Sequence, residues 1–318
     1  MSLYIDTLLF TSNIVAPIFF IVSLGYLLMR LRIIDQGFID TSSRLVFTIT
    51  LPVLVFMSIS RMNFQAVFNP QLMGYFVVST LIIVPFIWLI SRYFIKEPAD
   101  LGVFIQGSFR GNYGIIGLAI SFNMFGNSGL ALASLLLVCV IPLYNVLSVL
   151  ALSLPMQQSS GPSIIRPIKE IARNPLIIAV LLALPFSYYG WGLPSVGDKI
   201  GTYFANLTLP LALLAIGGSL NLKSLRNTSG QSGWSTLIKL IIMPLILTLG
   251  AWLYGFKGQE LGILFVLFGC PTAAASFIMA KAMGGNAQLA ANIILTTTLG
   301  SLITLSSGIY FLRLWNLI

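Results

Sequence analysis

The sequence contains no histidine, only two cysteines and very little charge. Without histidine it lacks the commonest general base and a common proton relay. Cys139 and Cys270 lie far apart in separate apolar segments, so neither a disulfide nor a metal pair is indicated. Charged residues make up 8% of the 318 residues, whereas a soluble domain carries about a quarter. The chain has too little polar surface to face water, which excludes a soluble protein.

Hydrophobic residues are abundant instead and make up 57% of the chain. A membrane helix needs about 20 mostly apolar residues. The first apolar run has no Lys or Arg ahead of it, so it lacks the basic region of a cleaved signal peptide and is expected to be retained. The sequence therefore predicts an all-α polytopic membrane protein with ten transmembrane helices. These expected spans cover residues 8–29, 37–59, 72–94, 100–123, 129–154, 173–190, 195–220, 235–256, 260–282 and 287–314.

The two halves of the chain resemble each other. Leu81 to Pro85 matches Leu240 to Pro244 at an offset of 159 positions (240 − 81). Three further pairs are each 158 positions apart: Pro17 and Pro175, Asp40 and Asp198, Pro52 and Pro210. Five expected spans lie in residues 1–156 and five in residues 173–318, joined by a polar linker at 157–172. Because each half has an odd number of spans, the second must be inverted, as in many secondary transporters.

Basic residues predict the orientation. The formal charge is +9, and most Lys and Arg residues follow expected spans 1, 3, 5, 7 and 9, including Arg92, Lys96 and Arg166. Basic loops are retained in the cytoplasm, so this charge indicates topology rather than nucleic-acid binding. We expect a multi-pass protein of the cell inner or plasma membrane. Both termini would face outward, and the linker would be cytoplasmic.

Expected span 4 carries unusual polarity. Arg110 and Asn112 lie near its middle, together with Gly111 and Gly114. A charge at bilayer depth is costly and usually marks a pathway or a ligand. Guanidinium binds carboxylates through two parallel hydrogen bonds, which favours an organic anion. Two alternatives remain open: a glycine-rich packing face, and an arginine that pairs with carbonyls or with a membrane-embedded acid.

Expected span 9 is the repeat partner of span 4. It carries Pro271, Thr272 and Ser276, and proline removes a backbone hydrogen bond from a helix. Interrupted helices at matching positions of two repeats are a sequence pointer to a transport site, although an ordinary kinked helix is the alternative. When the two halves are aligned at an offset of 160 positions, Arg110 corresponds to Cys270 (270 − 110), which carries no charge. We therefore expect only the first half to bring a charge to this site.

Spans 2 and 7 carry matched aspartates and prolines. Asp40 and Asp198 fall near the span starts and are interpreted as N-terminal caps. Pro52 and Pro210 are interpreted as hinges or as parts of a cavity wall. Asn145 in span 5 is expected to form an interhelical hydrogen bond rather than to bind a ligand.

With these residues assembled, the chain resembles the auxin efflux carrier family of permeases. The resemblance covers nearly the whole chain and is carried by Asn112 and Gly117, by Leu51-Pro52, and by the stretch from Pro271 to Lys281. It implies five-plus-five inverted topology, a fold related to bile-acid sodium symporters, broken spans 4 and 9 that cross, and organic anions as substrates. The family often has proline where this chain has Ala119, so the break in span 4 would depend on Gly111 and Gly114.

The sequence thus predicts a secondary transporter of a mono- or dicarboxylate, auxin-like or malonate- and malate-like, that works by alternating access. The expected substrate contacts are Arg110, Asn112, Tyr113, Pro271, Thr272 and Ser276, and the expected helix breaks are at Gly111, Gly114 and Pro271. No cofactor, metal or nucleic acid is expected, the partners being the anion and the lipid bilayer.

Several points stay open at this stage. The coupling ion, sodium or proton, is undetermined, and Asp100 and Glu260 are the nearest candidates for a proton carrier. A homodimer is an open question. An anion channel is the first alternative function. A membrane-embedded enzyme is the second, but Ser219 as nucleophile would have only a lysine base, so we predict no enzyme.

Overall fold

The computed structural model of the chain describes residues 2–61, 64, 68–156, 175–220 and 230–318. Within these ranges nearly every residue is helical, and the only strand pairing is one isolated bridge. Helices satisfy the backbone N–H and C=O groups internally, which a chain in hydrocarbon requires. The predicted all-α polytopic membrane protein is confirmed. The expected linker at 157–172 lies outside the described residues.

The elements run in chain order as α1 (Ser2–Arg30), α2 (Gln36–Leu45), η1 (Val46–Thr50), α3 (Leu51–Ser60), α5 (Pro70–Phe94), α6 (Pro98–Phe109), η2 (Tyr113–Gly117), α7 (Leu118–Ser153), η3 (Leu154–Met156), α9 (Pro175–Tyr189), α10 (Ser195–Ser219), α11 (Gly230–Leu237), η5 (Ile238–Ile242), α12 (Met243–Tyr254), α13 (Gly258–Gly269), α14 (Ala275–Ala282) and α15 (Ala287–Leu314). In the described ranges, eight helices are long and apolar enough to cross a membrane, and two shorter apolar helices join them. Together they overlap the ten expected spans, and the number of crossings stays a prediction.

Side chains at the helix starts explain several boundaries. Asp35, Asn69 and Asn286 each accept a hydrogen bond from the backbone N–H three residues later, at 2.8, 3.0 and 3.0 Å. Such caps satisfy donors that the first helical turn leaves free. The capping interpretation is wrong for both aspartates, because Asp35 rather than Asp40 caps α2, and Asp198 lies inside α10 and forms an ion pair.

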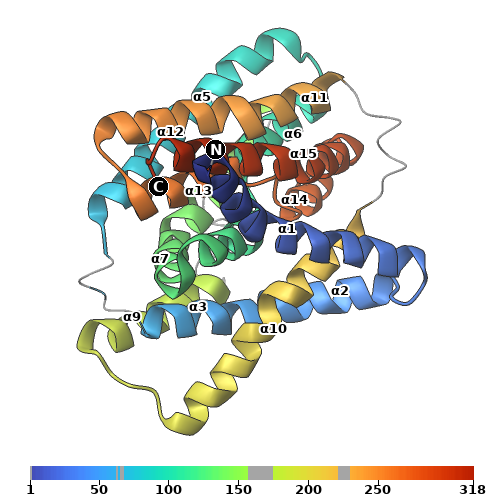
Figure 1. The fold of residues 1–318 in the computed structure, drawn as a ribbon. Helices are drawn as coiled ribbons and strands as arrows, with labels where there is room; N and C mark the ends of the chain where they lie inside the picture. Colours follow the sequence, from blue (N-terminus) through green and yellow to red (C-terminus); the bar gives the residue numbers. More distant parts are fainter. Residues whose placement is uncertain (1, 62–63, 65–67, 157–174, 221–229) are drawn as a thin grey trace.

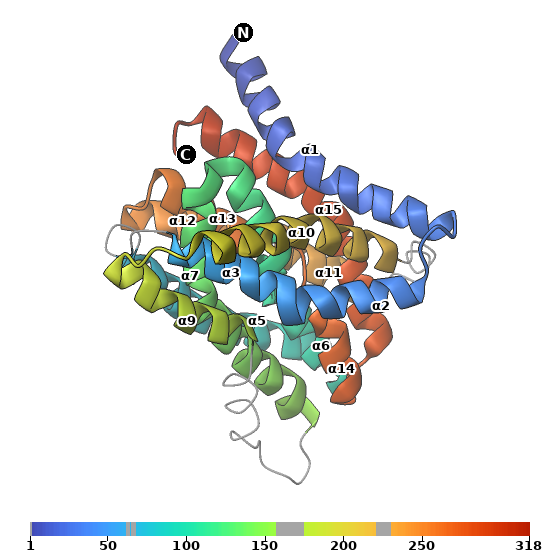
Figure 2. The ribbon, with the colours of Figure 1, turned by 90° about the horizontal axis from the view of Figure 1, so that it is seen from below.

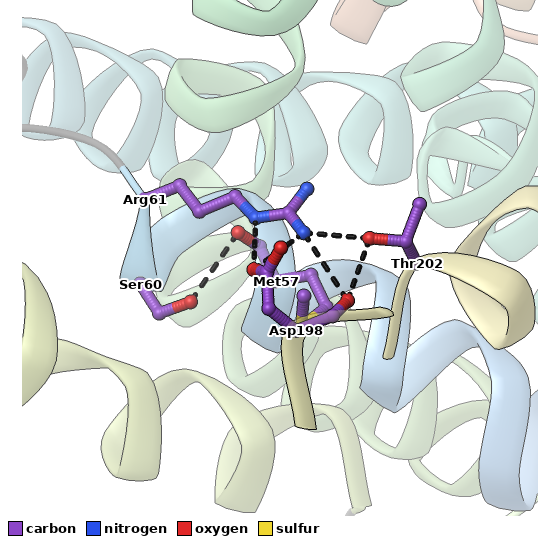
Figure 3. Close-up of polar contacts among 5 residues, drawn as sticks. All are labelled: Met57, Ser60, Arg61, Asp198 and Thr202. Carbon is purple, nitrogen blue, oxygen red and sulfur yellow. Dashed lines mark hydrogen bonds and ion pairs between the residues drawn. The ribbon is translucent and has the colours of Figure 1, made fainter. Parts of the chain in front are cut away.

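That ion pair joins the end of α3 to the first turns of α10 (Figure 3). Arg61 Nη2 lies 2.6 Å from Asp198 Oδ1 and also donates to Thr202 Oγ1 at 2.6 Å. Arg61 Nε donates to the same carboxylate oxygen at 3.0 Å. Both side chains are nearly half exposed, at 46% and 41%, so we expect the pair to stabilise the fold by about 0–1 kcal/mol. It links expected spans 2 and 7 at one end.

The helices form two groups that Figure 1 separates clearly. We call α1, α2, α3, α9 and α10 the panel helices: α10 packs against α1, α2 and α3, and α9 packs against α3. The short η1 joins α2 to α3 and belongs with the panel helices. The other elements form the crossover bundle, most of which lies in the upper part of Figure 1, and its helix α7 also packs against α1, α3 and α9. Figure 2 shows the panel helices from below, with α10 running between α1 and the α2–α3 pair. One hydrophobic core cluster runs through both groups, and a second, smaller cluster lies within the crossover bundle.

Two glycines allow the panel helices to touch. A Cβ added to Gly217 of α10 would collide with the carbonyl of Val22 in α1, and one added to Gly25 would collide with the carbonyl of Leu214. Small residues let membrane helices approach backbone to backbone, where dispersion contacts are dense. The contact between α1 and α10 therefore depends on these two glycines.

Candidate functional site

Two broken helices meet inside the crossover bundle. Helix α6 ends at Phe109 and α13 ends at Gly269, and each is followed by a short extended stretch. The stretches run antiparallel: Asn112 N donates to Pro271 O at 2.7 Å, and Ala273 N donates to Arg110 O at 3.0 Å. Backbone groups freed by the breaks thus satisfy one another, as the membrane interior requires. We call the residues 110–112 and 270–273 the crossover.

The three residues expected to break the helices lie at different places relative to the crossover. Gly111 and Pro271 lie within the extended stretches, whereas Gly114 lies one residue into η2, where the chain has begun to coil again. A Cβ on Gly111 would lie 3.3 Å from Cys270 Cβ and 3.4 Å from Leu267 O. The crossover is therefore packed too tightly at Gly111 to accept a side chain without movement.

Thr272 connects three parts of the crossover bundle. Its hydroxyl donates to Gly107 O in the last turn of α6 at 2.7 Å, and its backbone N–H donates to Thr297 Oγ1 of α15 at 3.0 Å. The hydroxyl therefore caps a carbonyl that the end of α6 leaves free. These bonds give Thr272 a structural task, and its predicted substrate contact stays a prediction.

The end of α13 is capped by a charge. Lys239 lies in η5, is fully buried, and donates from Nζ to Phe268 O at 2.5 Å. A positive group suits the C-terminal end of a helix, where carbonyl dipoles point outward. The expectation that only the first half brings a charge to this site is therefore wrong. Lys239 sits in the middle of an apolar segment, and this isolation was the sequence signal that could have identified it.

Arg110 supplies the other buried charge. Its side chain donates to Asn145 Oδ1 at 2.8 Å, to Ser148 Oγ at 2.9 Å and to the Met279 sulfur at 2.8 Å. All three partners are neutral. Among the described residues, Arg110 and Lys239 are the buried cations, and no Asp or Glu is buried. The positive charge of Arg110 is held in place but is not neutralised by an acid.

A cavity of about 970 Å³ reaches the crossover. Arg110, Asn112 and Tyr113 line it, as do Gly111 and Gly114. The other expected contacts, Pro271, Thr272 and Ser276, are buried and do not belong to its lining. Neither Pro52 nor Pro210 lines the cavity, and a hinge role for them stays a prediction. The structure thus brings three of the six expected contacts to one open space.

Both helix groups contribute to the cavity wall. The panel helices contribute Asp40 and Arg44 from α2, and Ala212 and Ser219 from α10. Residues of η2, α7 and α15 come from the crossover bundle. Asp40 and Arg44 are the exposed charged residues of this wall. A substrate in the cavity would touch both bodies at once.

Three buried hydroxyl groups near the crossover have no hydrogen-bond partner among the described residues. They belong to Tyr113, Tyr144 and Ser276, and the two tyrosines line the cavity. Tyr144 is 3% exposed, and its ring packs edge-on against Phe76 and Phe109. A buried hydroxyl without a partner is unfavourable, and a ligand or water molecule in the cavity would be the nearest source of a partner for the two tyrosines. Sequence reasoning missed Tyr144, because a tyrosine in a membrane helix resembles ordinary packing.

The acidic residues at the starts of α6 and α13 are engaged in hydrogen bonds. Asn286 Nδ2 donates to Asp100 Oδ1 at 2.8 Å, and Asn69 Nδ2 donates to Glu260 Oε1 at 2.6 Å. Each bond joins the two halves of the chain, since its partners are 186 and 191 residues apart. These contacts explain both carboxylates as braces of the crossover bundle.

Comparison with known proteins identifies the family. A family model described as membrane transport protein matches residues 10–309. The chain belongs to this family. It is the auxin efflux carrier-type family that the sequence resembles, so that resemblance is confirmed.

Several relatives cover nearly the same length. An uncharacterized transporter of Methanothermobacter thermautotrophicus is 23% identical over 93% of this chain and 96% of its own. A Rhizobium meliloti protein whose name proposes malonate transport is 25% identical over 95% of this chain and 96% of its own. The uncharacterized transporter YfdV of Escherichia coli is 24% identical over 94% of this chain and 96% of its own. The protein is therefore a membrane transporter by family.

Proposed function

We propose that the protein is a secondary transporter that carries a small organic anion, a mono- or dicarboxylate, across the cell inner or plasma membrane. The observation that carries this proposal is the placement of Arg110 on a cavity wall without an acidic partner. A buried charge is costly unless it is paired, and insertion scales put arginine at about 2.5–3.5 kcal/mol in the membrane centre. A substrate carboxylate would supply the missing charge.

The other groups on the wall suit the same ligand. The Tyr113 and Tyr144 hydroxyls lack partners and can donate to carboxylate oxygens, and the Asn112 side chain lies beside them on the cavity lining. Hydrogen bonds to a charged acceptor are stronger than neutral ones. The proposed site therefore combines one guanidinium with several neutral donors. The malonate named for the Rhizobium relative has two carboxylates that could use them.

Alternating access follows from the two groups of helices. The panel helices would form a scaffold, and the crossover bundle would rock against it with the substrate between them. The lining residues Gln36, Asp40 and Arg44 lie near the start of expected span 2, on the side where the basic loops predict the cytoplasm. On this proposal the structure is the inward-facing state of a five-plus-five inverted repeat, with the central linker inside.

The test is anion flux into proteoliposomes. We expect purified protein to exchange internal malonate for labelled external malonate, and Arg110→Gln to reduce this exchange by at least about 100-fold, the effect of about 2.8 kcal/mol. The matched control is Arg61→Gln, which also removes an arginine but lies far from the cavity, and it should exchange at the wild-type rate. Normal exchange by Arg110→Gln would remove Arg110 from the site. A current far larger than carrier turnover, without exchange, would favour a channel.

A further inference from the structure

Lys239 lies directly behind the cavity wall. Gly111 lines the cavity, and a Cβ added to it would lie 3.4 Å from Lys239 Nζ. The ammonium group therefore lies close to Gly111, which lines the same space as Arg110. Lys239 is fully buried, and charges in a low-dielectric interior act over longer distances than in solvent.

The charge of Lys239 has no counterpart in the first half of the chain. With the offset of 159 that relates Leu81 to Leu240, Lys239 corresponds to Thr80 (239 − 159). Thr80 is buried, and its hydroxyl has no partner among the described residues. The bond from Lys239 to Phe268 O caps α13, but Thr272 caps α6 with a neutral hydroxyl. Capping a broken helix here does not by itself require a charge.

The charges around the cavity do not balance. Arg110 and Lys239 bring two positive charges, and no Asp or Glu is buried among the residues that the structure describes. A monoanion in the cavity would offset one of these charges, and a dianion would offset both. Asp40 and Arg44 also line the cavity, but they are exposed and carry opposite charges. Among the buried groups, the ammonium of Lys239 is the second positive charge that a second ionised group of the ligand would meet.

We propose that Lys239 is a specificity-determining residue, whose ammonium supplies the second positive charge of the site and makes it prefer a dianion to a monoanion of the same size. This inference rests on the proposed anion transport. It assigns Lys239 a role in recognition although its side chain does not reach the cavity.

The experiment compares two probes that differ by one charge. Malonate and monomethyl malonate are similar in size, and at neutral pH the first is a dianion and the second a monoanion. Their kcat/KM values for exchange give a charge-preference ratio. We expect Lys239→Met, which keeps an unbranched side chain without the charge, to lower this ratio about tenfold, equivalent to about 1.4 kcal/mol. A residue that only caps α13 would affect both probes alike and leave the ratio unchanged, which would overturn the proposal.

A second pair of variants keeps Lys239 in place. Cys270 Cβ and Lys239 Nζ lie 3.3 and 3.4 Å from the same point beside Gly111, so Cys270→Asp would set a carboxylate next to the ammonium. Cys270→Asn has the same shape without the charge and is the matched control. We expect a lower charge-preference ratio for Cys270→Asp than for Cys270→Asn. Equal ratios for these two variants would contradict the proposal, and this test remains valid if Lys239→Met does not fold.

The outcomes for the wild type separate the two proposals. Exchange of neither probe would contradict the proposed function itself. Exchange of both probes at equal kcat/KM would leave anion transport standing and refute only the role of Lys239.

Discussion

At the scale of single residues, the site combines an arginine whose side chain is held by hydrogen bonds with tyrosine hydroxyls that have no hydrogen-bond partner among the described residues. Arg110 is held by three neutral partners from α7 and α14, so its guanidinium is oriented before any ligand arrives. Orienting a group in advance reduces the entropy lost on binding. The Tyr144 hydroxyl, in contrast, has no partner in the described residues. A ligand would change the surroundings of Tyr144 more than those of Arg110.

Tyr144→Phe separates binding from stability. The hydroxyl makes no hydrogen bond within the part of the chain that the structure describes, so its removal should not lower the free energy of unfolding. If the hydroxyl binds the substrate, KM for malonate exchange should rise about tenfold, within the roughly 0.5–3 kcal/mol range of one hydrogen bond to a neutral or charged group. Thermal unfolding and exchange kinetics measure the two effects.

Tyr75→Phe is the control for this variant. The Tyr75 hydroxyl donates to Leu247 O at 2.6 Å and lies outside the cavity lining. We expect the reverse result: a loss of about 0.5–1.5 kcal/mol in stability and an unchanged KM. A Tyr144→Phe variant that is destabilised but has normal KM would show that the hydroxyl serves packing rather than recognition.

At the scale of elements, some features could be predicted from the sequence and others could not. The interruptions in expected spans 4 and 9 follow from Gly111 and Pro271, because these residue types weaken a helix wherever they occur. The partners of Lys239 and Arg110 could not be predicted, because they depend on how distant helices pack. The same is true of the cavity: the sequence indicated Asn112 and Tyr113 but could not show that Ser276 lies outside it.

The contact between α1 and α10 gives a prediction at this scale. A methyl group at Gly217 has no room against the Val22 carbonyl, so Gly217→Ala must push the helices apart. We expect a loss of about 1–3 kcal/mol, the usual effect of overpacking, seen as a lower unfolding temperature in detergent. Gly74→Ala is the control, because nothing lies within 4 Å of the added Cβ in α5. Alanine there should be neutral or stabilise the helix by up to about 1 kcal/mol.

At the scale of the whole molecule, the proposed mechanism depends on two bodies that stay intact while they move. The panel helices are joined by the glycine contacts of α1 and α10 and by the ion pair of Arg61 and Asp198. The crossover bundle is braced by the hydrogen bonds of Asp100 and Glu260 to asparagines. These bonds fall within each body, so rocking would not have to break them.

The proposed orientation can be tested with single cysteines. In a background with Cys139 and Cys270 replaced by serine, Ser195→Cys and Gln36→Cys place thiols at exposed starts of α10 and α2. The basic loops predict that a membrane-impermeant maleimide labels Ser195→Cys on intact cells and Gln36→Cys only after lysis. The opposite labelling pattern would invert the topology and make the cavity outward-facing.

The antiparallel bridge at the crossover has one more consequence. Its two hydrogen bonds join main-chain atoms of Arg110, Asn112, Pro271 and Ala273, and no side chain takes part in them. Apart from Gly111, where an added Cβ is crowded, the frame depends little on which side chains its residues carry, because every residue except proline supplies the same N–H. The groups that select a substrate can therefore be exchanged while the frame that presents them persists. One architecture can in this way serve chemically different anions.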